Sequence, residues 1–262
     1  MRRRAPAAVW PLAALGLAFL ALPLAGLLQR APWASIAGHL GDPAVREALR
    51  LSLVVSCTAT VAALVLGVPL AWVLARATFP GRSLVRGLVL LPMVLPPVVG
   101  GLALLYALGR RGLAGQWLDR WLGVTLPFTT AGAVVAATFV ALPFLVVTVE
   151  GGLRSLDPRY EDAAATLGAG RWTVLRRVTL PMVAPSLAAG AALAWARALG
   201  EFGATITFAG NAPGRTRTMP IEVYLLREGS DRGGAVALSL VMVAVSLAVL
   251  ALLRDRWFPS TG

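Results

Sequence analysis

The chain alternates long apolar runs with short polar connections, and most of its charged residues lie in those connections. A helix of roughly 20 apolar residues is needed to cross about 30 Å of hydrocarbon, and six runs have that length. We therefore expect an all-α, polytopic membrane protein with six transmembrane helices. The predicted spans are Val9 to Leu28, Leu51 to Leu74, Leu84 to Leu108, Thr130 to Val149, Met182 to Phe208 and Ala235 to Leu253.

The first run follows Arg2, Arg3 and Arg4, a flank that is also typical of a secretory signal. The run is long for a signal core, and no small-x-small cleavage site follows it. We expect an uncleaved first helix and an external loop in residues 1–49. Residues 50–255 would then form the transmembrane domain, and residues 256–262 a short tail.

Prolines interrupt the third run, which reads LPMVLPPVVGG around Pro92, Pro96 and Pro97. Each proline removes a backbone donor and tends to kink a helix. Irregular backbone at membrane depth is tolerated where protein or a water-filled cavity covers it. This segment is therefore either a packed kink or part of a cavity lining.

Composition supports the membrane assignment, because 58% of the residues are hydrophobic and 14% are charged. A single soluble globule of this size could not hide so much apolar surface. The net charge of +12 would suit nucleic acid, but the arginines form short groups between apolar runs rather than one soluble face. We therefore expect the basic residues to lie beside a membrane, and we expect no nucleic acid as a partner.

Six spans place both chain ends on one side of the membrane. With a cytoplasmic N-terminus, the inside connections hold slightly more arginines than the outside ones, as the positive-inside rule requires. The clearest signals are the N-terminal arginines and the stretch from Arg76 to Arg86, which contains arginines and no acid. We expect cytoplasmic ends.

The sequence contains no pattern typical of catalysis, of a metal site or of nucleotide binding. It has one cysteine, Cys57, and one histidine, His39, which we expect in a hydrophilic connection. We predict no catalytic residue, no metal and no cofactor on this chain. If transport uses ATP, another subunit must bind it.

The segment from Glu150 to Pro181 is the most polar part between two spans. Asp157 and Pro158 are a helix-start signal, and acids in the following first turn are favoured by the helix dipole. Three alanines continue the helix, and Gly168 with Gly170 would stop it. We expect a short helix, a glycine turn and then a helix that enters the membrane.

This segment resembles the cytoplasmic loop of bacterial ABC importer permeases, whose pattern is Glu-Ala-Ala, three residues, Gly, nine residues, Ile-x-Leu-Pro. Here Asp162 replaces the glutamate, with Glu161 beside it, and Val178 replaces the isoleucine. In that family the short helix docks on a separate ATPase subunit and transmits its closure to the membrane. The alternative is a solvated amphipathic helix on the membrane surface. The resemblance implies an ATPase-coupling loop at residues 150–181, with Glu161, Asp162, Ala163, Ala164, Gly168, Leu180 and Pro181 in that role.

Arg197 and Glu201 lie within the predicted fifth span, four residues apart, so they share one helix face and can pair. Charges at such depth usually face a bundle interior or an aqueous path. A structural ion pair and a substrate contact both remain open.

The sequences ARALGEFGATITFAGN and PGRTRTMPIEVY closely resemble molybdate permeases, and less closely their sulfate and tungstate relatives. The resemblance spans about Leu51 to Leu253. It implies a type I ABC importer permease fold in the bacterial cytoplasmic membrane, a homodimer, an ABC ATPase subunit and an extracytoplasmic binding protein that delivers the small oxyanion. Sulfate or tungstate as the cargo, and more distantly an intramembrane enzyme or a scaffold, stay as alternatives.

A dianion is bound by donors rather than by carboxylates. Near the outer end of the fifth span we therefore expect Thr205, Thr207 and Asn211 to join Arg197 and Glu201 along the pathway. Arg215 and Arg217 follow in the sequence and are predicted to lie at the external mouth.

Overall fold

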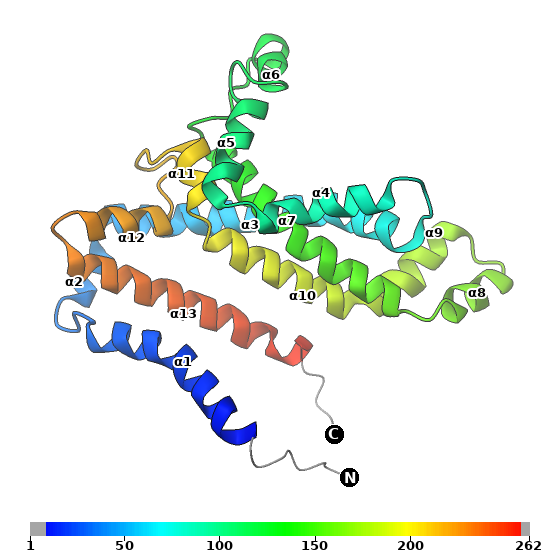
Figure 1. Cartoon of the computed structure of the whole chain (residues 1–262), viewed down its shortest axis with the longest axis horizontal. Coiled ribbons are helices and arrows are strands. Elements are labelled where there is room, and N and C mark those ends of the chain that lie inside the picture. The colour runs from blue at the N-terminus through cyan, green and yellow to red at the C-terminus, as the bar shows by residue number, and fades with distance from the viewer. Residues whose placement is uncertain (1–8, 258–262) are drawn as a thin grey trace.

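The computed structural model describes residues 9–257, and in this range the chain forms helices and turns but no strand (Figure 1). Most of the long helices run along one axis of the molecule. The elements are α1 (Val9–Gln29), α2 (Ile36–Gly41), α3 (Pro43–Arg76), α4 (Arg82–Val94), α5 (Pro97–Leu108), α6 (Gly115–Leu122), α7 (Thr130–Ser155), α8 (Arg159–Thr166), α9 (Arg171–Val174), the π-helix η1 (Leu175–Thr179), α10 (Leu180–Leu199), α11 (Gly203–Ala209), α12 (Met219–Glu228) and α13 (Arg232–Trp257).

The core lies where α3, α7 and α10 pack against one another. Small residues line these contacts: Ala63, Ala137 and Ala194 are fully buried. A side chain on Gly190 would meet the backbone of Leu145 on the neighbouring helix at 3.3 Å. Small residues allow helices to approach closely, which is how helices gain dispersion contacts inside a membrane.

The helices α1 and α13 lie at the edge of this core, and α1 touches the rest of the chain mainly through α13. No residue of α1 is buried. Figure 1 shows that α1 begins and α13 ends on the side directed toward α8. At the opposite end, His39 lies in the short helix α2 with its Nδ1 3.5 Å from Asp231, so the predicted hydrophilic connection after α1 contains a helix.

The third run is not the continuous span that we predicted, because the chain bends by 120° between α4 and α5. Pro96 and Pro97 supply no backbone donors, and Leu95 before them is extended, as the residue preceding a proline tends to be. Pro97 then starts α5, where its fixed φ suits the first helical position. Among residues 9–257, five helices could cross a membrane by length and composition, or six if the bent pair counts as one span.

The predicted fifth span is also broken, since α10 ends at Leu199 and α11 begins at Gly203. The two broken spans pack on each other through α5 and α11. A side chain on Gly203 would lie 2.8 Å from Pro97, and one on Gly101 would lie 2.8 Å from the carbonyl oxygen of Ala204. Close packing by α11 therefore covers the irregular backbone at the start of α5, as a packed kink requires.

The short helix α6 lies at the far end of α5 and stands away from the bundle (Figure 1). Asp119 anchors it by accepting hydrogen bonds from Arg110 Nε at 3.0 Å and from Thr125 Oγ1 at 3.0 Å. The hydrogen bond from Arg110, and to a smaller extent that from Thr125, holds the pKa of Asp119 below its ordinary value. The carboxylate therefore stays ionised and paired at neutral pH.

Candidate functional site

The short helix α8 forms where the local sequence predicts it. The side chain of Asp157 accepts a hydrogen bond from the backbone N–H of Arg159 at 3.0 Å, and Glu161 and Asp162 occupy the first turn. Gly168 follows the helix with a φ of +84°. A side chain there would meet nothing within 4 Å, so the glycine is required by the left-handed backbone and not by lack of space.

The two acids of α8 differ in what they contact. Glu161 accepts a hydrogen bond from Arg76 Nη2 at 3.1 Å and another from Thr179 Oγ1 at 2.7 Å. Asp162 is exposed and makes no ion pair within residues 9–257. Glu161 thus ties α8 to the end of α3 and to η1, a π-helical turn that leads directly into Leu180 and Pro181 of α10.

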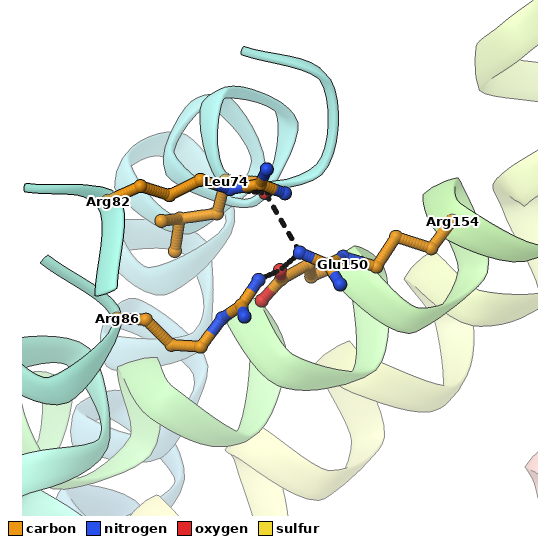
Figure 2. Close-up of polar contacts among 5 residues, drawn as sticks. All are labelled: Leu74, Arg82, Arg86, Glu150 and Arg154. Carbon is orange, nitrogen blue, oxygen red and sulfur yellow. Dashed lines mark hydrogen bonds and ion pairs between the residues drawn. The ribbon is translucent and has the colours of Figure 1, made fainter. Parts of the chain in front are cut away.

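A second cluster joins the same ends of α3, α4 and α7. Arg86 of α4 forms an ion pair with Glu150 of α7, and Arg154 approaches the same carboxylate at 3.0 Å (Figure 2). Glu150 is 7% exposed. The carbonyl oxygen of Leu74 on α3 accepts hydrogen bonds from Arg82 Nε at 3.0 Å and from Arg154 Nη2 at 3.4 Å.

We call these residues the junction: Leu74, Arg76, Arg82, Arg86, Glu150, Arg154, Glu161 and Thr179. Most of these contacts join residues far apart in the chain and are not apparent in the sequence. Glu150 is predicted at the start of the coupling loop, whereas α7 continues to Ser155 and buries that side chain. One signal in the sequence points to this cluster. Glu150 is an acid at the end of an apolar run, and the connection from Arg76 to Arg86 contains arginines but no acid that could pair with them.

Three large side chains in and just after α8 are exposed: Tyr160 is 57% exposed, Trp172 67% and Leu167 88%. The guanidinium of Arg176 lies 5.7 Å from the centre of the Trp172 ring, four residues earlier in the chain. Exposed large apolar side chains are common at protein contact surfaces.

At the other end of α10, the predicted Arg197–Glu201 pair forms with a separation of 2.7 Å. Glu201 lies beyond the end of α10 at Leu199, so the two residues do not share one helix face, as the sequence had predicted they would. Its other carboxylate oxygen accepts a hydrogen bond from Ala204 N at 2.7 Å and so satisfies a backbone donor at the start of α11. This geometry favours a structural pair that joins the two halves of the broken span, and a role in the pathway stays a prediction.

The remaining predicted pathway residues do not form one cluster. Thr205 is buried, the hydroxyl of Thr207 donates to Gly203 O at 2.7 Å within the helix, and Asn211 is exposed. Of the two predicted mouth residues, Arg217 is held by Asn211 O at 3.1 Å and by Glu222 at 3.4 Å. Arg215 is exposed, and within the described range none of the ion pairs includes it.

The sequence and the fold of this chain are both similar to those of known proteins. The family described as "Binding-protein-dependent transport system inner membrane component" matches residues 63–258. The Mycobacterium tuberculosis protein "Molybdenum transport system permease protein ModB" is 48% identical over 235 residues, which cover 90% of this chain and 88% of that protein. The Escherichia coli protein of the same name is 45% identical over 213 residues, covering 80% and 92%.

A more distant relative is the Escherichia coli "Sulfate transport system permease protein CysT", 38% identical over 234 residues that cover 88% of this chain and 84% of that protein. Among solved structures, a bacterial ABC transporter that imports alginate has a chain with a TM-score of 0.77 at 20% identity, covering 98% of this chain and 95% of its own. At that identity the likeness concerns the fold. Sequence and fold together make this chain a member of the family of binding-protein-dependent inner membrane transport components, with the helical fold of an ABC importer permease.

Proposed function

We propose that this permease carries molybdate, as one subunit of an ATP-driven importer that works by alternating access. The observation that carries the proposal is the 48% identity, over 90% of the chain, to a relative named as a molybdenum permease. The sulfate permease relative is 38% identical over a comparable length. Sulfate and tungstate share charge and shape with molybdate, so they are the alternatives that the experiment must separate.

ATP would bind a partner subunit that docks on α8. The exposed side chains of Tyr160, Leu167 and Trp172 supply an apolar contact surface beside this helix. The alanines of α8 would let the partner approach the backbone closely, and the sequence has no phosphate-binding loop of its own. Asp162 and Ala163 face solvent and are free to meet that partner.

Motion of α8 would reach the membrane helices through the junction. Glu161 binds Arg76 at the end of α3, while the Leu74 carbonyl and Glu150 connect α3, α7 and α4. The helix α4 continues directly into the break before α5. A rigid displacement at α8 would therefore act on the broken span without passing through a flexible connection.

The assembly would be a homodimer with α8 and both chain ends on the cytoplasmic side. One side of the helix α5 is exposed, with Tyr106 70% exposed and Val98 56% exposed, so a second copy could cover it. On the opposite face an extracytoplasmic binding protein would deliver the oxyanion. One alginate transporter with this fold has been solved with a ligand-bound periplasmic protein.

The cargo is tested with the complex of permease and ATPase subunit in proteoliposomes. ATP hydrolysis is measured with molybdate, tungstate or sulfate, each loaded on its own binding protein. We expect molybdate to give the largest stimulation. Greater stimulation by sulfate or tungstate would reassign the cargo, and no stimulation by any of the three would reject an oxyanion importer.

Replacing Glu161 by glutamine should lower the number of oxyanions imported per ATP hydrolysed. The substitution removes a partly exposed ion pair with Arg76, an effect of about 1 kcal/mol, and so loosens α8 from α3. Glu47→Gln is the matched control, because it removes the same charge from an exposed residue outside the coupling loop that lacks an ion pair in the described chain. If both variants import the same number of oxyanions per ATP hydrolysed, Glu161 does not transmit the motion of α8.

Replacing Arg215 by alanine should weaken docking of the loaded binding protein while the permease keeps its thermal stability. Arg215 offers an exposed guanidinium to the partner, and its backbone carbonyl, which accepts from Thr130 Oγ1, is retained in the variant. Arg217→Ala should instead lower stability, since Arg217 binds Asn211 and Glu222. Unchanged affinity and uptake in Arg215→Ala would end the assignment of this residue to the mouth.

A further inference from the structure

A hollow of about 610 Å³ lies between α1, α12 and α13. Arg30 after α1, Arg227 near the end of α12 and Arg232 at the start of α13 line it, together with the single acid Glu228. All four side chains are exposed, and none takes part in an ion pair within residues 9–257. This end of the hollow is therefore positively charged and has donors to offer.

A second hollow of about 410 Å³ adjoins the first, and Leu27 of α1 lines both. Its wall is apolar and comes from the last turns of α1, from Trp33 and Ile36, and from α13. On α13 the lining runs from Arg232 through Val236 and Leu240 to Leu247, a spacing that keeps these residues on one helix face. We call the two adjoining hollows along α13 the groove; the first is lined by charged side chains and the second is apolar.

The depth of the groove matches one leaflet of a bilayer. At 1.5 Å per residue, Leu240 lies about 12 Å along the axis from Arg232, and Leu247 about 22 Å. Half of the hydrocarbon core measures about 15 Å. The arginines lie where α1 and α12 end and α13 begins, which is where a membrane meets water, and the apolar part extends from there toward the bilayer centre.

We propose that this groove binds an anionic phospholipid, with its phosphate among Arg30, Arg227 and Arg232 and an acyl chain along α13. Arginine recognises phosphate oxygens through paired hydrogen bonds, and basic pockets between membrane helices suit anionic headgroups. The bound lipid fills the space that separates α1 from the bundle. This site is independent of the cargo that the permease carries.

Charge favours a lipid over a second copy of the chain as the occupant. An apolar helix of another copy would fit the deeper part of the groove. It would also have to bring carboxylates to the arginines, and the chain has 12 acidic residues against 24 basic ones. A phospholipid supplies the anion and the apolar chain in one molecule.

The test uses the purified permease complex in nanodiscs of phosphatidylcholine with a minor share of phosphatidylglycerol, followed by native mass spectrometry of the lipid that stays bound. Wild-type protein should retain phosphatidylglycerol in preference to phosphatidylcholine. The triple variant Arg30→Gln, Arg227→Gln, Arg232→Gln should retain at least about tenfold less of it, since each surface arginine adds to anionic-lipid affinity. The matched control Arg46→Gln, Arg111→Gln, Arg120→Gln removes the same charge from exposed positions outside the groove and should retain it fully.

A second variant tests the apolar part with the arginines in place. Ala244→Trp fills the groove and should displace the lipid without a change in charge. Retention of phosphatidylglycerol in this variant, or equal retention in the two triple variants, would overturn the proposal. Displacement by inorganic phosphate alone would show a free-anion site instead. In a Cys57→Ser background, an intermolecular disulfide between Leu28→Cys and Ala244→Cys would show that a second copy occupies the groove.

Discussion

Replacing Glu150 by glutamine should lower the melting temperature of the purified permease complex, because it removes the carboxylate that Arg86 and Arg154 share. Glu150 is 7% exposed, and both Arg86 and Arg154 reach it. Breaking a fully buried ion pair costs about 3–5 kcal/mol. The arginine side chains are 36% and 44% exposed and can be hydrated in the variant, which reduces the expected loss to about 1–3 kcal/mol.

Glu47→Gln is the matched control for this variant, since Glu47 is exposed and makes no ion pair within the described chain. Its melting temperature should stay within error of the wild type. The double variant Arg86→Gln, Glu150→Gln should lose less stability than the sum of the two single variants, as expected for groups in direct contact. Strictly additive losses would show that Arg86 and Glu150 do not stabilise the fold as a pair.

Replacing Gly168 by valine should abolish most transport while the membrane bundle stays folded. Gly168 has a φ of +84°, and a side chain in the left-handed region costs about 1–3 kcal/mol, most of all when it is β-branched. The chain would relieve this strain by changing the turn after α8, so the helix would present a different face to the ATPase subunit. We expect uptake to fall by about tenfold or more, which corresponds to about 1.4 kcal/mol.

Two controls separate backbone strain from crowding. Gly168→Asn should keep most of the activity, because asparagine tolerates the left-handed region. Gly170→Val places the same valine two residues later, at a φ of −66° in open space, and should be nearly neutral. Uptake and ATPase co-purification are measured in all three variants. Loss in Gly170→Val or full activity in Gly168→Val would contradict the strain argument.

The short helix α8 was predictable because each of its signals is local. Asp157 and Pro158 start it, the following acids suit its first turn, and Gly168 ends it, all within one short stretch of chain. The apolar runs were equally informative about the number of spans, because the bilayer alone sets their length. Capping, proline chemistry and hydropathy act over a few residues or a single helix, so one sequence contains all the information that they need.

The sequence by itself therefore determined the membrane class, the approximate spans, the short helix and its glycine turn. Only the tertiary structure decided that Glu161 faces inward and Asp162 outward, and that Arg86 and Arg154 meet at Glu150. It also decided that the two broken spans pack against each other through α5 and α11. These features join residues more than 60 positions apart, as with Arg86 and Glu150, or depend on a bend of 120°. Ion pairs and helix breaks of this kind depend on which helices become neighbours after packing. Hydrophobic periodicity shows which residues are apolar, but it does not specify which helices pack together.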